Sequence, residues 1–600
     1  MPGLKAESKY VHTIIIGCGV SGIATAALLK RKLNFEDVHI FERYSGAGGV
    51  WFINQYPGAS CDIPVSLYSY SFAQRRDWAK AWPGRDVIQK YYESVWREYG
   101  LESKTSFGTE VVAAKFDAST NLWHVWTRSA AQPAHDARKD SKPEAVAFDD
   151  LEGYQHWVCK ALVNAVGGLS EPNKCDIPGA ENFQGPIFHS ARWDTSVNMA
   201  DKRVVLLGNG CSGAQIVESL SPKVKHLTQL GRSKQWFLAW EGDLETKPMR
   251  FLQWLLPGFV RTIVFFLLET HFLSFRKEKG RAQRERVAKA SAEHIRKTAP
   301  KEYHEMLIPD QKSLEVGCKR RIVDQGYLKA LNRPNIDLRN CGAKEIREHS
   351  VILDNGDEVP ADVVVLATGF SIREGGGVLK IFGRDGVRDI NTYLSQEYKE
   401  PSTYRSTMIT DFPNLFMVMT GFNSTTGHSS VVYTAECQIE WMIRTGRDLF
   451  NERSRPSKAE LVFGGETERA GVGASGSRQR FPSIEPKREA QVKEMLWFQE
   501  KMQDFVFSGA CGAWYVDPSS GAVAAIYPGS QVDFWRRARF PLHDDLLYRD
   551  FPEDKGNVHR PSRTWSEWVG ATLGWGQVGE PQTKLGRKME GGKIIRAGPE

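Results

Sequence analysis

Short apolar runs, each ending at glycines, mark the places where buried strands are expected. The first is "HTIIIGCGVSGIATAALLKRKL" with "VHIFER" after it, and the second is "KRVVLLGNGCSGAQIVESL" with "VKHLTQLGR" after it. Each pattern is typical of a strand, a glycine turn, a helix and a second strand. A third run, "ADVVVLATGF" at 361–370, predicts a further strand of a parallel sheet. The chain is therefore expected to have an α/β fold.

The first glycine turn has the spacing G-x-G-x-x-G, formed by Gly17, Gly19 and Gly22. Missing side chains let the backbone approach a pyrophosphate, which lies at the helix N-terminus where free N–H groups favour negative charge. Glu42 follows at the end of the next strand and is placed to accept hydrogen bonds from ribose hydroxyls. A carboxylate there suits FAD or NAD.

The second turn repeats this spacing with Gly208, Gly210 and Gly213, but Arg232 takes the place of the carboxylate. A guanidinium attracts the 2'-phosphate that a carboxylate would repel, which favours NADPH. One such turn alone is a weak signal, whereas two in the strand-turn-helix context support each other. We expect two Rossmann-like dinucleotide-binding domains, for FAD first and NADPH second.

With 600 residues the chain is too long for one hydrophobic core, so several domains are expected. Residues 236–316, rich in Leu, Phe, Lys and Arg, predict an inserted helical region, and 464–480 a mobile loop. The FAD-binding domain is expected in two parts, 1–168 and 381–545. The NADPH-binding domain is also expected in two parts, 169–235 and 317–380, on either side of the inserted region 236–316. A C-terminal extension, 546–600, follows.

Composition excludes some classes of function. The net charge of +7 is spread along the chain without a dominating basic block, so nucleic acid is not an expected partner. The nine cysteines contain no C-x-x-C pair and no metal-like spacing, so we expect packing residues in a reducing compartment, with no metal site. No secretory signal is recognised before the first strand, and a cytoplasmic location is expected.

The segment 251–275, "FLQWLLPGFVRTIVFFLLETHFLSF", is the most apolar stretch outside the strands. A membrane helix needs about 18 apolar residues in succession, and Gln253, Pro257, Arg261 and Glu269 interrupt this one. We expect a helical region packed on its own protein. Attachment to a membrane surface is the alternative that stays open.

A longer motif lies between the two glycine turns. The stretch "FQGPIFHSARWD" carries Phe183, Gly185, His189, Trp193 and Asp194 in the order F-x-G-x-x-x-H-x-x-x-W-[P/D]. This resembles the fingerprint of type I Baeyer-Villiger monooxygenases. "GGVWFINQYPGASCD", "GCKRR" and "LATGF" resemble further segments of that family, and the resemblance covers about residues 10 to 545.

The resemblance implies an enzyme that uses FAD, NADPH and O2 to insert one oxygen atom next to a ketone carbonyl, through a flavin peroxide, giving an ester or lactone. It implies that Arg320 is the cation that stabilises negative charge beside the flavin. Asp62 then orients this arginine through a charge-assisted pair. Arg321 is an adjacent rival for the same role.

Further site residues follow from the resemblance. Gly49, Trp51 and Tyr56 belong to the segment that lies along the flavin, and Lys319 is expected to share the 2'-phosphate of NADPH with Arg232. Trp514, in "CGAWYVD", resembles a tryptophan near the nicotinamide ribose. The fingerprint is expected to link the two domains, with Phe183 and Trp193 as anchors, Gly185 as a flexible point and His189 ordering the linker. The departures of this chain from the family pattern leave the identity of the ketone open.

Two other activities use the same cofactors. A heteroatom monooxygenase would oxygenate an amine or sulfide, and an NADPH oxidase would release hydrogen peroxide. A noncatalytic nucleotide-binding scaffold is a third alternative, disfavoured by the intact glycines, Arg320 and Asp62.

Overall fold

We describe a computed structural model of the chain. It covers the following residues: 8–131, 134–138, 151, 153–239, 247–371, 379–398, 402–420, 423–424, 427, 429–463, 478–508, 515–516, 521–552, 564–565, 587–590 and 593–596. Trp514 and most of the predicted loop 464–480 lie outside them.

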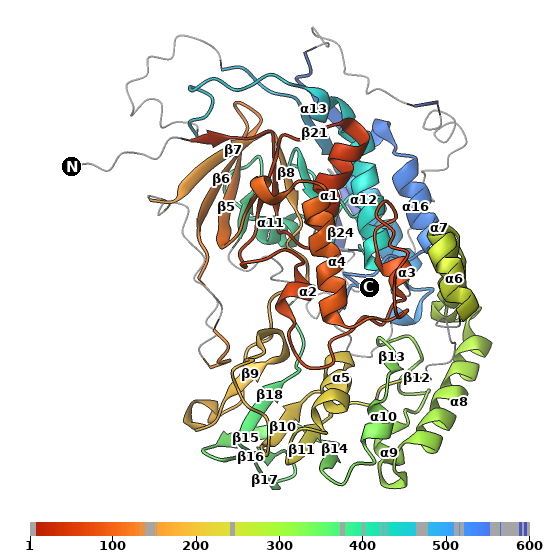
Figure 1. Ribbon diagram of the computed structural model, residues 1–600. Coiled ribbons are helices and arrows are strands. Elements are labelled where there is room, and N and C mark those ends of the chain that lie inside the picture. Colours follow the sequence, from red (N-terminus) through yellow and green to blue (C-terminus); the bar gives the residue numbers. More distant parts are fainter. Residues whose placement is uncertain are drawn as a thin grey trace.

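The upper part of the molecule in Figure 1 is built on a five-stranded parallel sheet of order β20-β8-β2-β3-β4. Its strands are β2 (Thr13–Ile16), β3 (Val38–Phe41), β4 (Thr105–Ser106), β8 (Ala161–Asn164) and β20 (Leu415–Met417). A second sheet, β1-β7-β6-β5-β19, is mixed: its three central strands are antiparallel, and β1 and β19 pair in parallel at its two edges. It contains β1 (Lys9–Tyr10), β5 (Thr109–Asp117), β6 (Leu122–Ser129), β7 (Gln155–Cys159) and β19 (Lys380–Phe382).

The alternation of side chains along the parallel strands explains the layers. Ile15 and Ile40 face a core shared with the helices α1 (Val20–Leu33), α4 (Arg85–Glu98) and α12 (Val431–Thr445). Their neighbours Ile14 and Phe41 face the second sheet, where they pack with Phe116. Because successive side chains point to opposite faces, a strand that is apolar throughout is buried on both sides.

The lower part of the molecule repeats this plan. Its parallel sheet has the order β14-β11-β10-β18-β9. The strands are β9 (Ile187–His189), β10 (Arg203–Leu207), β11 (His226–Leu230), β14 (Ile336–Arg339) and β18 (Val363–Leu366). One face packs on α5 (Cys211–Leu220) and α10 (Tyr327–Ala330), and the other on a three-stranded antiparallel sheet, β15 (Ala343–Arg347), β16 (Ser350–Leu353) and β17 (Glu358–Pro360).

The predicted α/β class with parallel sheets is confirmed, and the strand expected within 361–370 is β18, between β10 and β9. In the described part of the chain, four helices lie between β12 (Phe237–Ala239) and β13 (Ile322–Asp324), which pair in parallel. They are α6 (Lys247–Leu255), α7 (Pro257–Thr270), α8 (Arg281–Thr298) and α9 (His304–Leu307). The domain boundaries remain a prediction.

The remaining elements complete the upper part and the C-terminal segment. The helices are α2 (Val50–Ile53), α3 (Val65–Tyr68), α11 (Ile390–Glu397), α13 (Arg447–Asn451), α15 (Arg488–Met502) and α16 (Gln531–Arg539). The strands are β21 (Ser483–Pro486), β22 (Leu546–Arg549), β23 (Arg587–Glu590) and β24 (Lys593–Arg596). In the described part of the chain, one helical segment, Pro257–Phe275, is long and apolar enough to cross a membrane by length and composition.

Candidate active site

The first glycine turn lies between β2 and α1 and brings three backbone segments into close contact. Gly17 has φ +101°, and a Cβ on Gly22 would lie 1.9 Å from the carbonyl oxygen of Gly17. A Cβ on Gly49, where φ is +57°, would lie 2.8 Å from Cα of Gly19. These positions have no room for a side chain, so the turn keeps the bare backbone that a pyrophosphate requires.

The electrostatics of this turn also fit a dinucleotide. Helix α1 begins with no side-chain cap and no acidic residue in its first turn, which leaves its N–H groups and dipole for an anion. The buried carboxylate of Glu42 accepts hydrogen bonds from the backbone N–H groups of Cys18 at 2.8 Å and Tyr44 at 2.9 Å. Burial raises the pKa of Glu42. Backbone hydrogen bonds therefore hold this carboxylate beside the turn.

The second glycine turn has the same construction between β10 and α5. A Cβ on Gly208, with φ +114°, would lie 2.3 Å from the oxygen of Ala367, and one on Gly213 would lie 2.4 Å from the oxygen of Gly208. Gly210 faces open space instead, so the side from which a phosphate would approach is clear. Arg232 is exposed after β11 and makes no ion pair with any described residue.

Arg320 and Asp62, 258 residues apart in sequence, form a two-pronged ion pair. Arg320 donates from Nε to Oδ2 of Asp62 at 2.9 Å and from Nη2 to Oδ1 at 2.6 Å. The Asp62 side chain is 22% exposed, whereas that of Arg320 is 52% exposed. The carboxylate therefore fixes the guanidinium on one side and leaves its other side accessible.

Arg320 and its rival Arg321 have opposite environments. The charge of Asp62 raises the pKa of Arg320, so this guanidinium stays protonated. Burial, and then the charge of Arg320, lowers the pKa of Arg321 to about 10. The Arg321 guanidinium lies 5.3 Å from the ring centre of Phe275, and its Nη1 is buried without a hydrogen-bond partner among the described residues. Of the two, Arg320 is the accessible and oriented cation.

Hydrogen bonds join the Asp62 segment to the second glycine turn. Tyr56 donates from its hydroxyl to Oε1 of Gln215 on α5 at 2.8 Å, and Gln215 donates to the backbone oxygen of Ser60 at 3.0 Å. Ser60 donates to Oε1 of Gln325 at 2.8 Å. A Cβ on Gly58 would lie 2.6 Å from the oxygen of Gln215. Sequence reasoning missed Gln215 and Gln325, because nothing in their spacing marks this contact.

The other predicted cofactor residues lie around this junction. Trp51 is buried in α2, with its ring centre 5.6 Å from that of Tyr68. Lys319 is half-buried beside Arg320, and burial lowers its pKa. No contact between Lys319 and Arg232 is found among the described residues. The expectation for Trp514 falls outside them.

The fingerprint stretch forms β9 and the turn after it, at the edge of the lower sheet. Phe183 is buried in the core beside this sheet. A Cβ on Gly185 would lie 2.3 Å from the oxygen of Asp362. Gly185 has no positive φ, so the structure explains this glycine by close packing against the segment that enters β18, and its role as a flexible point remains a prediction.

His189 ends β9 and caps the following turn. Its Nδ1 accepts a hydrogen bond from the N–H of Ala191 at 3.1 Å, and burial lowers its pKa to about 4. A neutral ring that binds the backbone agrees with an ordering role. Trp193 packs against Phe188 with ring centres 5.0 Å apart, and the Asp194 carboxylate accepts hydrogen bonds from Ser196.

A partly buried ion network that the sequence did not reveal connects the fingerprint to the upper sheet. Glu171 forms an ion pair with Arg43, which follows β3, and lies 3.8 Å from Arg192 of the fingerprint. Arg192 also donates to the oxygen of Ser170 at 3.4 Å. The three charges hold the linker between the two parts of the molecule.

The cysteines differ from the prediction at one position. Cys18, Cys61, Cys159, Cys175, Cys211, Cys341 and Cys437 are unpaired, as expected for packing residues. Cys318, next to Lys319, is disulfide-bonded, so the expectation is wrong there.

The fold and the site define a two-dinucleotide α/β protein in which a paired arginine lies where the two nucleotide-binding parts meet. Comparison with known proteins agrees with this class. The family model of an NAD(P)-binding Rossmann-like domain matches residues 15–81.

Two curated relatives are Baeyer-Villiger monooxygenases. The one from Pseudomonas aeruginosa is 30% identical over 529 residues, covering 87% of this chain and 89% of the relative. The one from Streptomyces coelicolor is 29% identical over 536 residues, covering 88% and 91%. The chain belongs to the Baeyer-Villiger monooxygenase family.

Solved structures show the same fold. Cyclohexanone monooxygenase from Rhodococcus sp. Phi1 bound to NADP+ matches with a TM-score of 0.69 and 23% identity, over 90% of this chain and all of that one. A steroid monooxygenase bound to NADP matches with a TM-score of 0.70 and 22% identity over the same shares.

Proposed function

We propose that this chain is an FAD-dependent, NADPH-consuming monooxygenase that inserts one oxygen atom of O2 next to a ketone carbonyl and releases an ester or lactone. The family membership and the names of its relatives support this reaction. The observation that carries the proposal is the two-pronged pair of Arg320 with Asp62 beside the second glycine turn.

The first turn and the segment that follows it would hold FAD. Gly17, Gly19 and Gly22 leave the backbone bare for the pyrophosphate, and Glu42 is placed for the ribose hydroxyls. Gly49 allows the 48–51 turn to lie against the first glycine turn. Bound FAD would supply the redox chemistry, which is the acceptance of hydride from NADPH and the reaction with O2.

The second turn would hold NADPH. Gly208, Gly210 and Gly213 form the pyrophosphate site, and the exposed Arg232 is available for the 2'-phosphate. The half-buried Lys319 is the second cation proposed for that phosphate. Because burial already disfavours its charged form, a nearby phosphate would stabilise that charge.

Arg320 would stabilise the negative charge that develops during oxygen insertion. A cation already fixed in position needs no reorganisation when that charge appears, which makes it effective. Asp62 holds Arg320 in position, because its two carboxylate oxygens accept hydrogen bonds from Nε and Nη2 of the guanidinium. Tyr56, through Gln215, anchors the segment that carries Asp62 to the NADPH-binding part.

The partners in this proposal are a small-molecule ketone and O2, and the cytoplasmic location remains a prediction. The test is a panel of ketones and sulfides incubated with the purified holoprotein, NADPH and O2, followed by mass spectrometry. The proposal expects ketone products that have gained one oxygen atom. Sulfoxides without any ester or lactone would favour the heteroatom monooxygenase, and hydrogen peroxide equal to the NADPH consumed, with every ketone, would favour the oxidase.

A further inference from the structure

The α6–α7 segment, residues 247–270, exposes an apolar surface at the edge of the molecule, on the right in Figure 1. Six large side chains on it are each at least 50% exposed: Phe251, Trp254, Leu256, Phe259, Phe266 and Leu267. Single exposed apolar residues are ordinary, but a contiguous group of this size marks an interaction surface. We call this group the outer face.

Three of the polar residues that interrupt the apolar sequence, Gln253, Arg261 and Glu269, are turned toward the protein. Arg261 is only 8% exposed and donates to the backbone oxygens of Ser66, Leu67 and Ser69, the last at 2.6 Å. It also lies 3.4 Å from Glu436 on α12. These contacts explain why a charge stands in so apolar a helix.

Gln253 and Glu269 are turned inward in the same way. Gln253 is buried and donates to the oxygen of Arg75 at 3.3 Å. Glu269 accepts hydrogen bonds from the N–H groups of Gln531 and Val532 at the start of α16. Three of the four interruptions that argue against a membrane in the linear sequence, Gln253, Arg261 and Glu269, are therefore turned away from the outer face of the folded segment.

This arrangement inverts the usual pattern of a surface helix, in which the apolar stripe faces the core and charges face water. The inner face does pack on its own protein, as the sequence predicts, through Val260, Val264 and Leu67. The outer face is apolar as well. Water is a poor partner for such a face, and the apolar region of a lipid bilayer is a good one.

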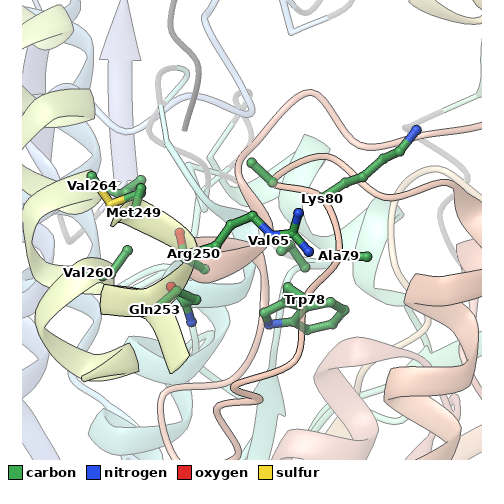
Figure 2. Close-up of a pocket in the computed structure, with 11 residues that line it drawn as sticks. Val65, Trp78, Ala79, Lys80, Met249, Arg250, Gln253, Val260 and Val264 are labelled. Atoms are coloured by element: carbon green, nitrogen blue, oxygen red, sulfur yellow. The ribbon is translucent and has the colours of Figure 1, made fainter. Parts of the chain in front are cut away.

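Exposed basic side chains lie beside α6 and beyond the C-terminal end of the apolar segment. Arg250 and Lys80 are both exposed and both line a small cavity of about 40 Å³ beneath α6. Figure 2 shows Arg250 extending from α6 toward Trp78, with Lys80 on the facing loop. At the other end, Lys279 is exposed beyond the apolar segment. Cations beside an apolar face are complementary to anionic lipid headgroups.

We infer that the outer face of the α6–α7 segment docks this protein onto the surface of an anionic lipid bilayer. The segment lies in the interface and does not span the bilayer, because Arg261 and Glu269 are held by the body of the protein. Trp535, which is 44% exposed, lies on α16, the helix whose first residues contact Glu269, and we take it as an extension of the same surface. The inference is independent of the proposed reaction.

The test uses the full-length holoprotein in flotation with vesicles of phosphatidylcholine alone or in equal parts with phosphatidylglycerol. We expect binding to the anionic vesicles and a loss of about tenfold or more in the Phe259→Ser/Phe266→Ser variant. The matched control is Val87→Ser/Val387→Ser, which removes exposed apolar residues elsewhere and should bind as the wild type does. Wild-type protein that stays unbound, or a patch variant that binds equally well, would overturn the inference.

A second variant measures the contribution of the basic side chains to vesicle binding separately from that of the apolar side chains. Its substitutions lie outside the apolar core. Lys80→Glu/Arg250→Glu should weaken binding to the anionic vesicles and leave the weaker binding to neutral vesicles unchanged, with normal FAD content as the folding control. Unchanged binding to the anionic vesicles would contradict the inference. Light scattering tests whether a second copy of this chain covers the outer face instead. A wild-type dimer that does not bind vesicles, and that Phe259→Ser/Phe266→Ser dissociates, would show that it does and would overturn the inference.

Discussion

The substitution Asp62→Asn isolates the contribution of the ion pair to catalysis. It keeps the shape of the side chain and removes the charge that orients Arg320 through contacts of 2.6 and 2.9 Å. Asp62 raises the pKa of Arg320, but an arginine remains protonated at neutral pH without that help. In the variant, Arg320 therefore keeps its positive charge but is no longer held in position.

The expected magnitude follows from the exposure of the pair. Two unit charges about 4 Å apart interact by about 4 kcal/mol at an effective dielectric constant of about 20. Because the Arg320 side chain is 52% exposed, solvent screening reduces this to about 1–2 kcal/mol. At about 1.4 kcal/mol for each factor of ten, oxygenated product should form about 5- to 30-fold more slowly.

The assay measures product formation and NADPH consumption side by side in the flavin-saturated variant. We expect the rate of product formation to fall while its pH dependence near neutrality stays unchanged. Glu278→Gln is the matched control, since its pair with Arg281 is largely exposed on both sides and should contribute almost nothing. An Asp62→Asn enzyme that forms product at the wild-type rate would refute the orienting role.

Three further predictions concern the cofactor sites and the fingerprint. Arg232→Ala should raise the KM for NADPH about tenfold or more and leave that for NADH unchanged in steady-state kinetics, and an unchanged preference would reject the 2'-phosphate contact. Gly49→Ala should lower the ratio of flavin to protein absorbance, because φ is +57° there and the new Cβ would lie 2.8 Å from the first glycine turn. Gly100→Ala is the control: φ is +67° but the site is open, so this variant should keep its full flavin content. Burial lowers the pKa of His189 from 6.5 to about 4, so the unfolded chain binds the extra proton and the free energy of unfolding should fall as the pH drops from 6.5 toward 4. His189→Gln should flatten that fall in urea unfolding, and an equally steep fall would contradict the assignment.

Much of the framework could be predicted from the sequence, because its signals are local. An apolar run, the glycines and a helix pattern lie within about 30 residues of one another, and they define each nucleotide-binding unit before any tertiary contact forms. The partnership of Arg320 with Asp62 was predicted only through the family resemblance. Their separation of 258 residues gives no local signal.

The parts that escaped prediction depend on which way a side chain points after packing. Arg261 interrupts an apolar run in the sequence, but in the fold it is turned inward, where it binds the backbone of α3. Gln215 and Glu171 look like ordinary polar residues until the two parts of the molecule meet around them. Gly185 suggests a flexible point by residue type, and the structure adds that a side chain there would have no space.

The most direct test of the central claim is Arg320→Ala, studied with FAD bound. Rapid mixing with NADPH measures flavin reduction, and mass spectrometry measures the oxygenated ketone. Our account predicts flavin reduction close to that of the wild type, a loss of product of about 10²- to 10³-fold, and electrons that leave as hydrogen peroxide. Ester or lactone formed at the wild-type rate by this variant would contradict the claim that a fixed guanidinium stabilises the charge of oxygen insertion.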